Sequence, residues 1–177
     1  MGKRVLTLWK GISTAAVLVV VILTILLVGV RLFGYDVYYV LSSSMVPTYE
    51  TGELLYVKET DPKDIEKGTP ITFALNTNTV VTHRVIEVIN REEDPGTRYF
   101  RTKGDANNMA DGTLISEDNV LGVPKYSIPK LGYLAFYIQN PPGRYIAIAV
   151  AAFILFFTFL PDVLGEGQNK KRGDLKG

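Results

Sequence analysis

One serine, one histidine and two aspartates have the residue types that a nucleophilic hydrolase needs. Ser44 ends a run of three serines, and His83 is the single histidine of the chain. A serine hydroxyl becomes a useful nucleophile at neutral pH only beside a base, which is most often an imidazole. A carboxylate beside the imidazole then fixes its tautomer and stabilises its protonated form. Asp105 and Asp111, six residues apart, are both candidates for this third role, and their spacing does not choose between them.

The serine run, residues 42–44, is followed by the apolar residues Met45 and Val46. Serine clusters at strand ends are usually polar turns. An apolar pair directly beside a serine is unusual for an exposed turn and suits a site that faces lipid or an apolar peptide. We therefore expect Met45 to contact the substrate of such a site.

His83 lies inside an alternating run, in which Val81, His83 and Val85 share one face of a predicted strand. A lone histidine in a strand can also be structural, with its nitrogens bonded to backbone groups. Residues 104–107 (Gly-Asp-Ala-Asn) are first of all a turn sequence. Together, however, the three segments provide a nucleophile, a base and an orienting carboxylate.

The composition excludes several other kinds of site. The 177 residues include no cysteine, which removes disulfides, thiolate nucleophiles and cysteine-ligated metals. One histidine cannot form a multi-histidine metal site, so we expect neither a metal nor a cofactor. The net charge is +1 and the basic residues are dispersed, so nucleic acid is not an expected partner.

The elements that would position these residues begin with an uncharged apolar run at residues 12–30. At 1.5 Å per residue this run reaches about 28 Å, close to the thickness of the bilayer core. Lys3, Arg4 and Lys10 precede it, as in a signal sequence, but the run is too long for one and no small-x-small cleavage site follows. We predict an uncleaved membrane anchor.

A second apolar segment, residues 145–160, is shorter. Its aromatic residues favour a second transmembrane helix, although an interfacial or core helix can have the same length. Basic residues precede the first segment and follow the second, and such residues tend to stay in the cytoplasm. We predict a multi-pass cell-membrane protein with a cytoplasmic stub and anchor (1–33), an extracytoplasmic domain (34–140), a second helix (141–164) and a basic cytoplasmic tail (165–177).

Between the apolar segments the sequence changes to short β-type runs separated by turn residues, without helical periodicity. The runs lie at residues 36–41, 53–58, 69–75, 79–90, 98–103 and 119–128. This pattern predicts a mostly β fold: a small antiparallel barrel-like or sandwich catalytic domain, flanked by the two helices.

In this order the three chemical segments resemble the boxes of the signal peptidase I family, in its archaeal and endoplasmic-reticulum branch. Residues 42–47 (Ser-Ser-Ser-Met-Val-Pro) match the nucleophile box and residues 82–85 (Thr-His-Arg-Val) the general-base box. Residues 104–107 with Asp111 match the third box, and the resemblance extends to about Tyr126. Bacterial-type relatives have lysine where this chain has His83, so the histidine indicates the branch.

The resemblance implies a role for each candidate residue. Ser44 would be the nucleophile and His83 the general base. Asp111 would be the charge-relay partner, and Asp105 a supporting residue. The Ser44 backbone N–H and the Ser42 hydroxyl would hold the oxyanion.

The resemblance further implies a membrane serine endopeptidase that removes signal peptides from secreted preproteins after small-x-small motifs. Signal peptides and the lipid bilayer would be its partners, and any need for accessory subunits is left open. In a eukaryote the site would face the lumen of the endoplasmic reticulum. Ser43 stands where the family often has glycine, and the C-terminal apolar segment favours a prokaryotic source.

Two alternatives stay open at this point. A serine–lysine peptidase of the same fold would use Lys103 or Lys58 as its base. A membrane-tethered β domain that only binds partners would require Ser44 and His83 to lie far apart.

Overall fold

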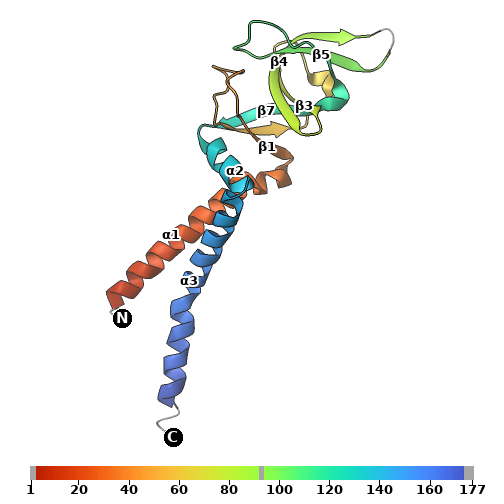
Figure 1. Ribbon diagram of the computed structural model, residues 1–177. Coiled ribbons are helices and arrows are strands. Elements are labelled where there is room, and N and C mark those ends of the chain that lie inside the picture. Colours follow the sequence, from red (N-terminus) through yellow and green to blue (C-terminus); the bar gives the residue numbers. More distant parts are fainter. Residues whose placement is uncertain (1–2, 92–93, 174–177) are drawn as a thin grey trace. The chain divides into compact units, whose positions relative to one another are not determined.

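The chain divides into two compact units in the computed structural model, which describes residues 3–91 and 94–173. One unit combines Met1–Leu27 with Tyr137–Gly177 and is helical, whereas the other, Val28–Phe136, contains the strands (Figure 1).

Helix α1 (Lys3–Leu27) begins the helical unit. Within the described residues, the segment Thr7–Leu27 is the only unbroken helical segment that is long and apolar enough to cross a bilayer. None of this segment is buried, which distinguishes it from the core helix of a soluble protein. The predicted N-terminal apolar helix is therefore confirmed.

Helix α3 (Gly143–Gly173) packs against α1 inside the same unit. The Trp9 indole N–H donates a hydrogen bond of 3.2 Å to the Phe157 carbonyl, and the two ring centroids lie 6.1 Å apart. The apolar part of α3 passes the same test for a membrane span only together with α2 (Leu131–Gln139), as a pair interrupted at residues 140–142. A second crossing of the membrane stays a prediction.

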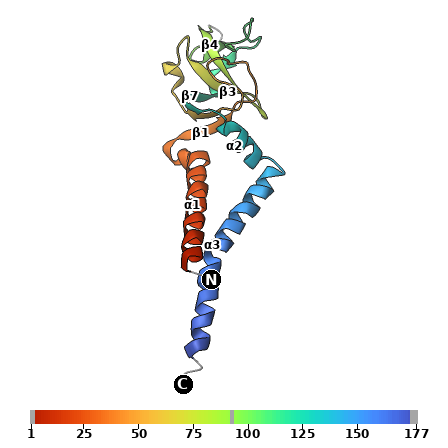
Figure 2. The same ribbon diagram turned by 90° about the vertical axis from the view of Figure 1, so that its left-hand side faces the viewer.

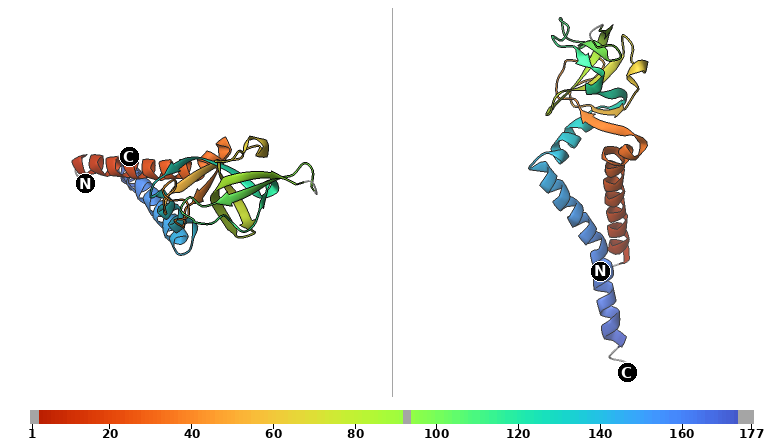
Figure 3. Two further views of the ribbon diagram at one scale, coloured as in Figure 1. Left: turned by 90° about the horizontal axis from the view of Figure 1, so that it is seen from above. Right: turned by 90° about the vertical axis from the view of Figure 1, so that its right-hand side faces the viewer.

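The other unit is built on one antiparallel sheet of seven strands, in the order β1-β2-β7-β3-β4-β5-β6. The strands are β1 (Tyr35–Tyr39), β2 (Leu54–Lys58), β3 (Pro70–Asn76), β4 (Thr79–Asn90), β5 (Arg98–Lys103), β6 (Ile115–Ser116) and β7 (Val120–Ile128). Three short 3-10 helices accompany them: η1 (Gly29–Phe33), η2 (Pro62–Asp64) and η3 (Glu117–Asn119). Figures 2 and 3 show that the sheet is curled. The mostly antiparallel β fold is confirmed, and its closure into a barrel or division into a sandwich stays a prediction.

The core of this unit combines side chains from strands β3 to β7 with Ile65. Its buried residues are Ile65, Ile71, Phe73, Val85, Phe100, Ile115 and Val123. The alternation predicted for β4 holds, because His83 and Val85 are both buried while Arg84 between them is not. His83 thus lies beside the core, and its ring centroid is 6.4 Å from that of Phe73.

Helix α2 corrects the expectation that no helix lies between the two apolar segments. Its sequence, Leu-Gly-Tyr-Leu-Ala-Phe-Tyr-Ile-Gln, is apolar at nearly every position, so it carries no helical period that a pattern search can find. Gly132 lets its first turn approach the sheet, because a Cβ there would lie 2.3 Å from the Glu53 carbonyl oxygen.

Candidate active site

The nucleophile segment, residues 42–47, follows β1. Backbone hydrogen bonds fix the chain just before this segment and within it. Before it, Val40 exchanges bonds of 2.9 Å with Glu53 and Gly52. Within it, the Ser44 carbonyl accepts a bond of 2.9 Å from the Ala106 N–H, in the loop that carries both candidate aspartates. The segment that holds the serine is thus joined directly to the segment that holds the carboxylates.

Ser44, His83 and Asp111 form one continuous chain of polar contacts. Ser44 Oγ lies 3.2 Å from His83 Nε2, and His83 Nδ1 lies 2.6 Å from Asp111 Oδ2. Because an ionised carboxylate only accepts hydrogen bonds, Nδ1 carries the proton and Nε2 is left free to accept one from the serine. This arrangement can transfer the hydroxyl proton to the imidazole, whose resulting charge then lies beside a carboxylate.

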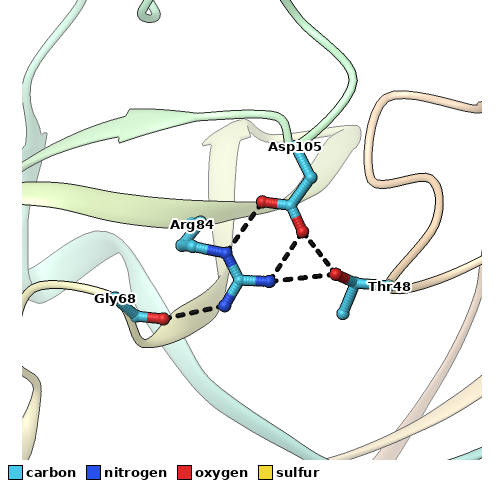
Figure 4. A network of polar contacts seen from close by, with 4 residues as sticks. All are labelled: Thr48, Gly68, Arg84 and Asp105. Carbon is cyan, nitrogen blue, oxygen red and sulfur yellow. Dashed lines mark hydrogen bonds and ion pairs between the residues drawn. The ribbon is translucent and has the colours of Figure 1, made fainter.

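Asp105 points to a different partner from Asp111. Its two carboxylate oxygens accept bonds of 2.8 and 2.6 Å from Nε and Nη2 of Arg84, and Oδ2 also accepts a bond of 2.5 Å from the Thr48 hydroxyl (Figure 4). Arg84 completes the network by donating to the Gly68 carbonyl at 2.8 Å and to Thr48 Oγ1 at 3.0 Å. Asp105 is therefore bonded to Arg84 and Thr48, whereas the carboxylate bonded to His83 in the described part of the chain is that of Asp111.

The charge state of this second network is fixed by its own contacts. Hydrogen bonding to Arg84 holds the pKa of Asp105 below its usual value, with a further contribution from Thr48. The same bond to Asp105 raises the pKa of Arg84. The pair is a permanent ion pair near neutral pH, so it can position neighbouring segments but cannot transfer protons.

Gly104 allows the loop that carries the two aspartates to approach the backbone of Ser44 closely. A Cβ at this position would lie 2.6 Å from the Ser44 carbonyl oxygen and 2.8 Å from the Asn107 side-chain nitrogen. The Asn107 N–H also donates to the Gly104 carbonyl at 3.0 Å, which closes the turn. The turn predicted for residues 104–107 is thus present, and it requires glycine for close approach.

Thr102 is a contact of this site that the sequence analysis missed. It is fully buried on β5, and its hydroxyl donates to Asp111 Oδ2 at 2.6 Å. A signal for it was available, because Thr102 alternates with the apolar Phe100 and therefore falls on the buried face of β5. A polar side chain on a core-facing position almost always has a hydrogen-bond partner.

Ser42 and Met45 are the two remaining candidate residues, and the structure shows how each lies relative to Ser44. The Ser42 hydroxyl is 3.1 Å from Ser44 Oγ and is exposed, so it borders the nucleophile. Met45 is only 2% exposed, so its side chain packs beneath the segment in this conformation. Its predicted contact with a substrate stays a prediction.

The two alternatives to a serine–histidine site find less support in the same geometry. Neither Lys58 nor Lys103 has a recorded hydrogen bond to Ser44 within the described part of the chain, and Lys58 Nζ lies over the Tyr35 ring at 5.6 Å from its centroid. The pure binding domain required Ser44 and His83 to be distant, yet their side chains are 3.2 Å apart. Within the described ranges, no group of three or more His, Cys, Asp or Glu side chains could hold a metal ion.

Comparison with known proteins gives a match to the family described as "Signal peptidase, peptidase S26", over residues 13–99. Signal peptidase I W of Bacillus subtilis (strain 168) is 39% identical over 109 residues, which cover 57% of this chain and 56% of that protein. The chain belongs to the signal peptidase family.

Other members extend the likeness to eukaryotes. The signal peptidase complex catalytic subunit of Rattus norvegicus is 31% identical over 126 residues, covering 66% of this chain and 65% of that subunit. The subunit of Dictyostelium discoideum with the same description is 29% identical over 126 residues, covering 66% and 69%.

The matches cover only part of this signal peptidase family member and only part of its relatives. It spans little more than half the length of the Bacillus relative and about two thirds of the eukaryotic subunits. The family match includes Ser44 and His83 but ends at residue 99, before the loop with Asp105 and Asp111. The family match therefore says nothing about the roles of Asp105 and Asp111. Those roles are argued from the contacts that the two residues make in this chain.

Proposed function

We propose that the protein is a membrane-bound serine endopeptidase that removes signal peptides from secreted preproteins. The observation that carries the proposal is the contact chain from Ser44 through His83 to Asp111, with distances of 3.2 and 2.6 Å, in a chain of the signal peptidase family. No cofactor or metal enters the proposed reaction.

The proposed reaction has two halves. Ser44 Oγ attacks the scissile carbonyl carbon while its proton moves to His83 Nε2, and the C–N bond then breaks as His83 returns the proton to the leaving amine. Water next attacks the acyl-enzyme with His83 as base, which releases the signal peptide and restores Ser44. Asp111 stabilises the imidazolium in both halves.

Oxyanion stabilisation is assigned to the Ser44 N–H and the Ser42 hydroxyl. The position of Ser42 Oγ, 3.1 Å from Ser44 Oγ, supports this assignment because the negative charge develops close to the nucleophile. Each such donor contributes about 3 kcal/mol to transition-state stabilisation.

The substrate is proposed to be a preprotein whose signal helix is still in the bilayer, cut after a small-x-small motif. The apolar, unburied segment Thr7–Leu27 supports a membrane location. We assign residues 34–140 to the extracytoplasmic side and residues 141–164 to a second crossing, and packing of Trp9 against Phe157 supports the pairing of the two helices.

The relatives differ in whether their descriptions place them in a complex with other subunits. The Rattus and Dictyostelium relatives are described as catalytic subunits of a complex, whereas the Bacillus relative is described as a signal peptidase I. If this chain works alone, the purified protein will suffice for cleavage.

The test is cleavage of a model secretory precursor by the purified full chain in detergent or lipid vesicles. Wild type and the neighbouring control Ser43→Ala should cut at the small-x-small site, and Ser44→Ala should not. Cleavage by Ser44→Ala would overturn the assignment of the nucleophile. Absence of cleavage by wild type, even in membranes of its source, would overturn the function.

A further inference from the structure

Thr102 contacts Asp111 with both its side chain and its backbone. The Thr102 hydroxyl donates to Asp111 Oδ2 at 2.6 Å, and the Asp111 N–H donates to the Thr102 carbonyl at 2.9 Å. Thr102 itself is fully buried within β5, so it is a fixed point in the sheet.

Asp111, in contrast, lies outside regular secondary structure. The three residues before it and the two after it are exposed, and its own side chain is 24% exposed. Of its recorded side-chain contacts, one is with His83 Nδ1 and the other is with the Thr102 hydroxyl, and both use Oδ2. Besides the imidazole that it serves, the Thr102 hydroxyl is therefore the side-chain group that joins this carboxylate to the sheet within the described residues.

We propose that the Thr102 hydroxyl is a positioning group, which holds the Asp111 carboxylate in the orientation that accepts the His83 Nδ1 proton. Through this contact Thr102 selects the imidazole tautomer that leaves Nε2 facing Ser44. The inference rests on the proposed function for its kinetic consequence, but its structural consequence can be measured without any activity.

The chain contains a matched control for this role. Thr72 on β3 is also fully buried, and its hydroxyl lies 2.8 Å from Thr82 Oγ1 rather than from a member of the site. Thr102→Val and Thr72→Val each remove one buried hydroxyl from the same sheet. They differ in whether Asp111 loses a donor.

The kinetic test compares precursor cleavage by Thr102→Val, Thr102→Ser, Thr72→Val and wild type. Thr102→Val should lower kcat about tenfold at an unchanged KM, because a hydrogen bond to a charged group is lost and Thr102 does not touch substrate. Thr102→Ser keeps the hydroxyl and should restore most of the rate. Thr72→Val should stay within about twofold of wild type, the range expected when no contact of the site changes.

The spectroscopic test uses the fact that His83 is the single histidine of the chain. Labelling with [15N]histidine therefore gives imidazole signals from this residue alone. Wild type, Thr72→Val and Thr102→Ser should show one tautomer, protonated on Nδ1. Thr102→Val should show averaging between the two nitrogens, because the carboxylate no longer has a fixed orientation.

The outcomes separate the two proposals. If the His83 signals of Thr102→Val match those of wild type, or if Thr72→Val lowers kcat as much as Thr102→Val, the positioning role is wrong. If the signals respond as expected but wild type cleaves no precursor, the positioning role stands and the proposed function fails.

Discussion

Two neighbouring residues of β4, His83 and Arg84, each contact one aspartate of the same loop, with opposite chemical results. His83 pairs with Asp111 and faces Ser44, whereas Arg84 pairs with Asp105 and Thr48. An imidazole gains and loses a proton near neutral pH, but a guanidinium remains charged. One strand thus contributes both a titratable group beside Ser44 and a charged group in an ion pair that joins Asp105 to Thr48 and Gly68.

The comparison shows why two aspartates six residues apart are not interchangeable. Successive side chains of a strand point to opposite faces, so His83 and Arg84 reach different parts of the loop. Asp111 meets the buried face and Asp105 meets the other face. Variants of the His83–Asp111 pair should therefore lose far more rate than variants of the Arg84–Asp105 pair, whose loss should include stability.

The largest effect is expected from removing the imidazole. His83→Ala should lower kcat/KM for precursor cleavage by at least about 10⁴-fold, since Ser44 then has no base. Steady-state assays of the purified variant, with a thermal melt to establish that it folds, would measure this. Full activity in His83→Ala or in His83→Lys would refute the serine–histidine assignment.

The next effect separates the two aspartates. Asp111→Asn should lower kcat by about 10⁴-fold, because an amide favours the wrong imidazole tautomer. Asp105→Asn should cost less than about 100-fold, since it changes only the positioning of neighbouring segments. Parallel assays of the two isosteric variants give the ratio directly. Equal losses, or a larger loss in Asp105→Asn, would reverse the roles assigned here.

The smallest effect concerns the pH dependence of stability. The pKa of Asp105 is lowered by Arg84 and, to a smaller extent, by Thr48, so its contribution to stability is present above the usual value of 3.8 and is lost as the pH falls below it. Asp105→Asn should thus destabilise the domain by about 2 kcal/mol at neutral pH, from the loss of charge-assisted hydrogen bonds. Thermal melts of wild type and variant should converge in acid. A difference that persists unchanged below the pH at which Asp105 is protonated would contradict the ion-pair account.

The sequence predicted the parts of the site whose patterns are local. The alternation around His83 placed it on one face of a strand with Val81 and Val85, and the glycine turn at residues 104–107 was readable from residue types. The partners of Asp105 and Asp111 depend on how β3, β4 and β5 are paired, which no short pattern encodes. Spacing alone therefore left the two aspartates equivalent, and the resemblance assigned Asp111 to the relay.

Other features were missed for equally physical reasons. Thr102 looks like an ordinary strand residue until its neighbour across space is known. The apolar sequence of α2 hides the helical period, so the helix was not expected. The number of membrane crossings depends on the lipid surroundings of α3 as well as on its sequence, and it stays a prediction.

The position of β7 in the sheet has a consequence for the timing of assembly during synthesis. β7 is the last strand to be made, yet it is the strand that joins β2 to β3. Until residues 120–128 have been synthesised, the ladder that leads to Ser44 and the ladder that contains His83 are separate pieces of sheet. The sheet that leads to Ser44 and carries His83 is therefore continuous only when β7 is paired with both of its neighbours.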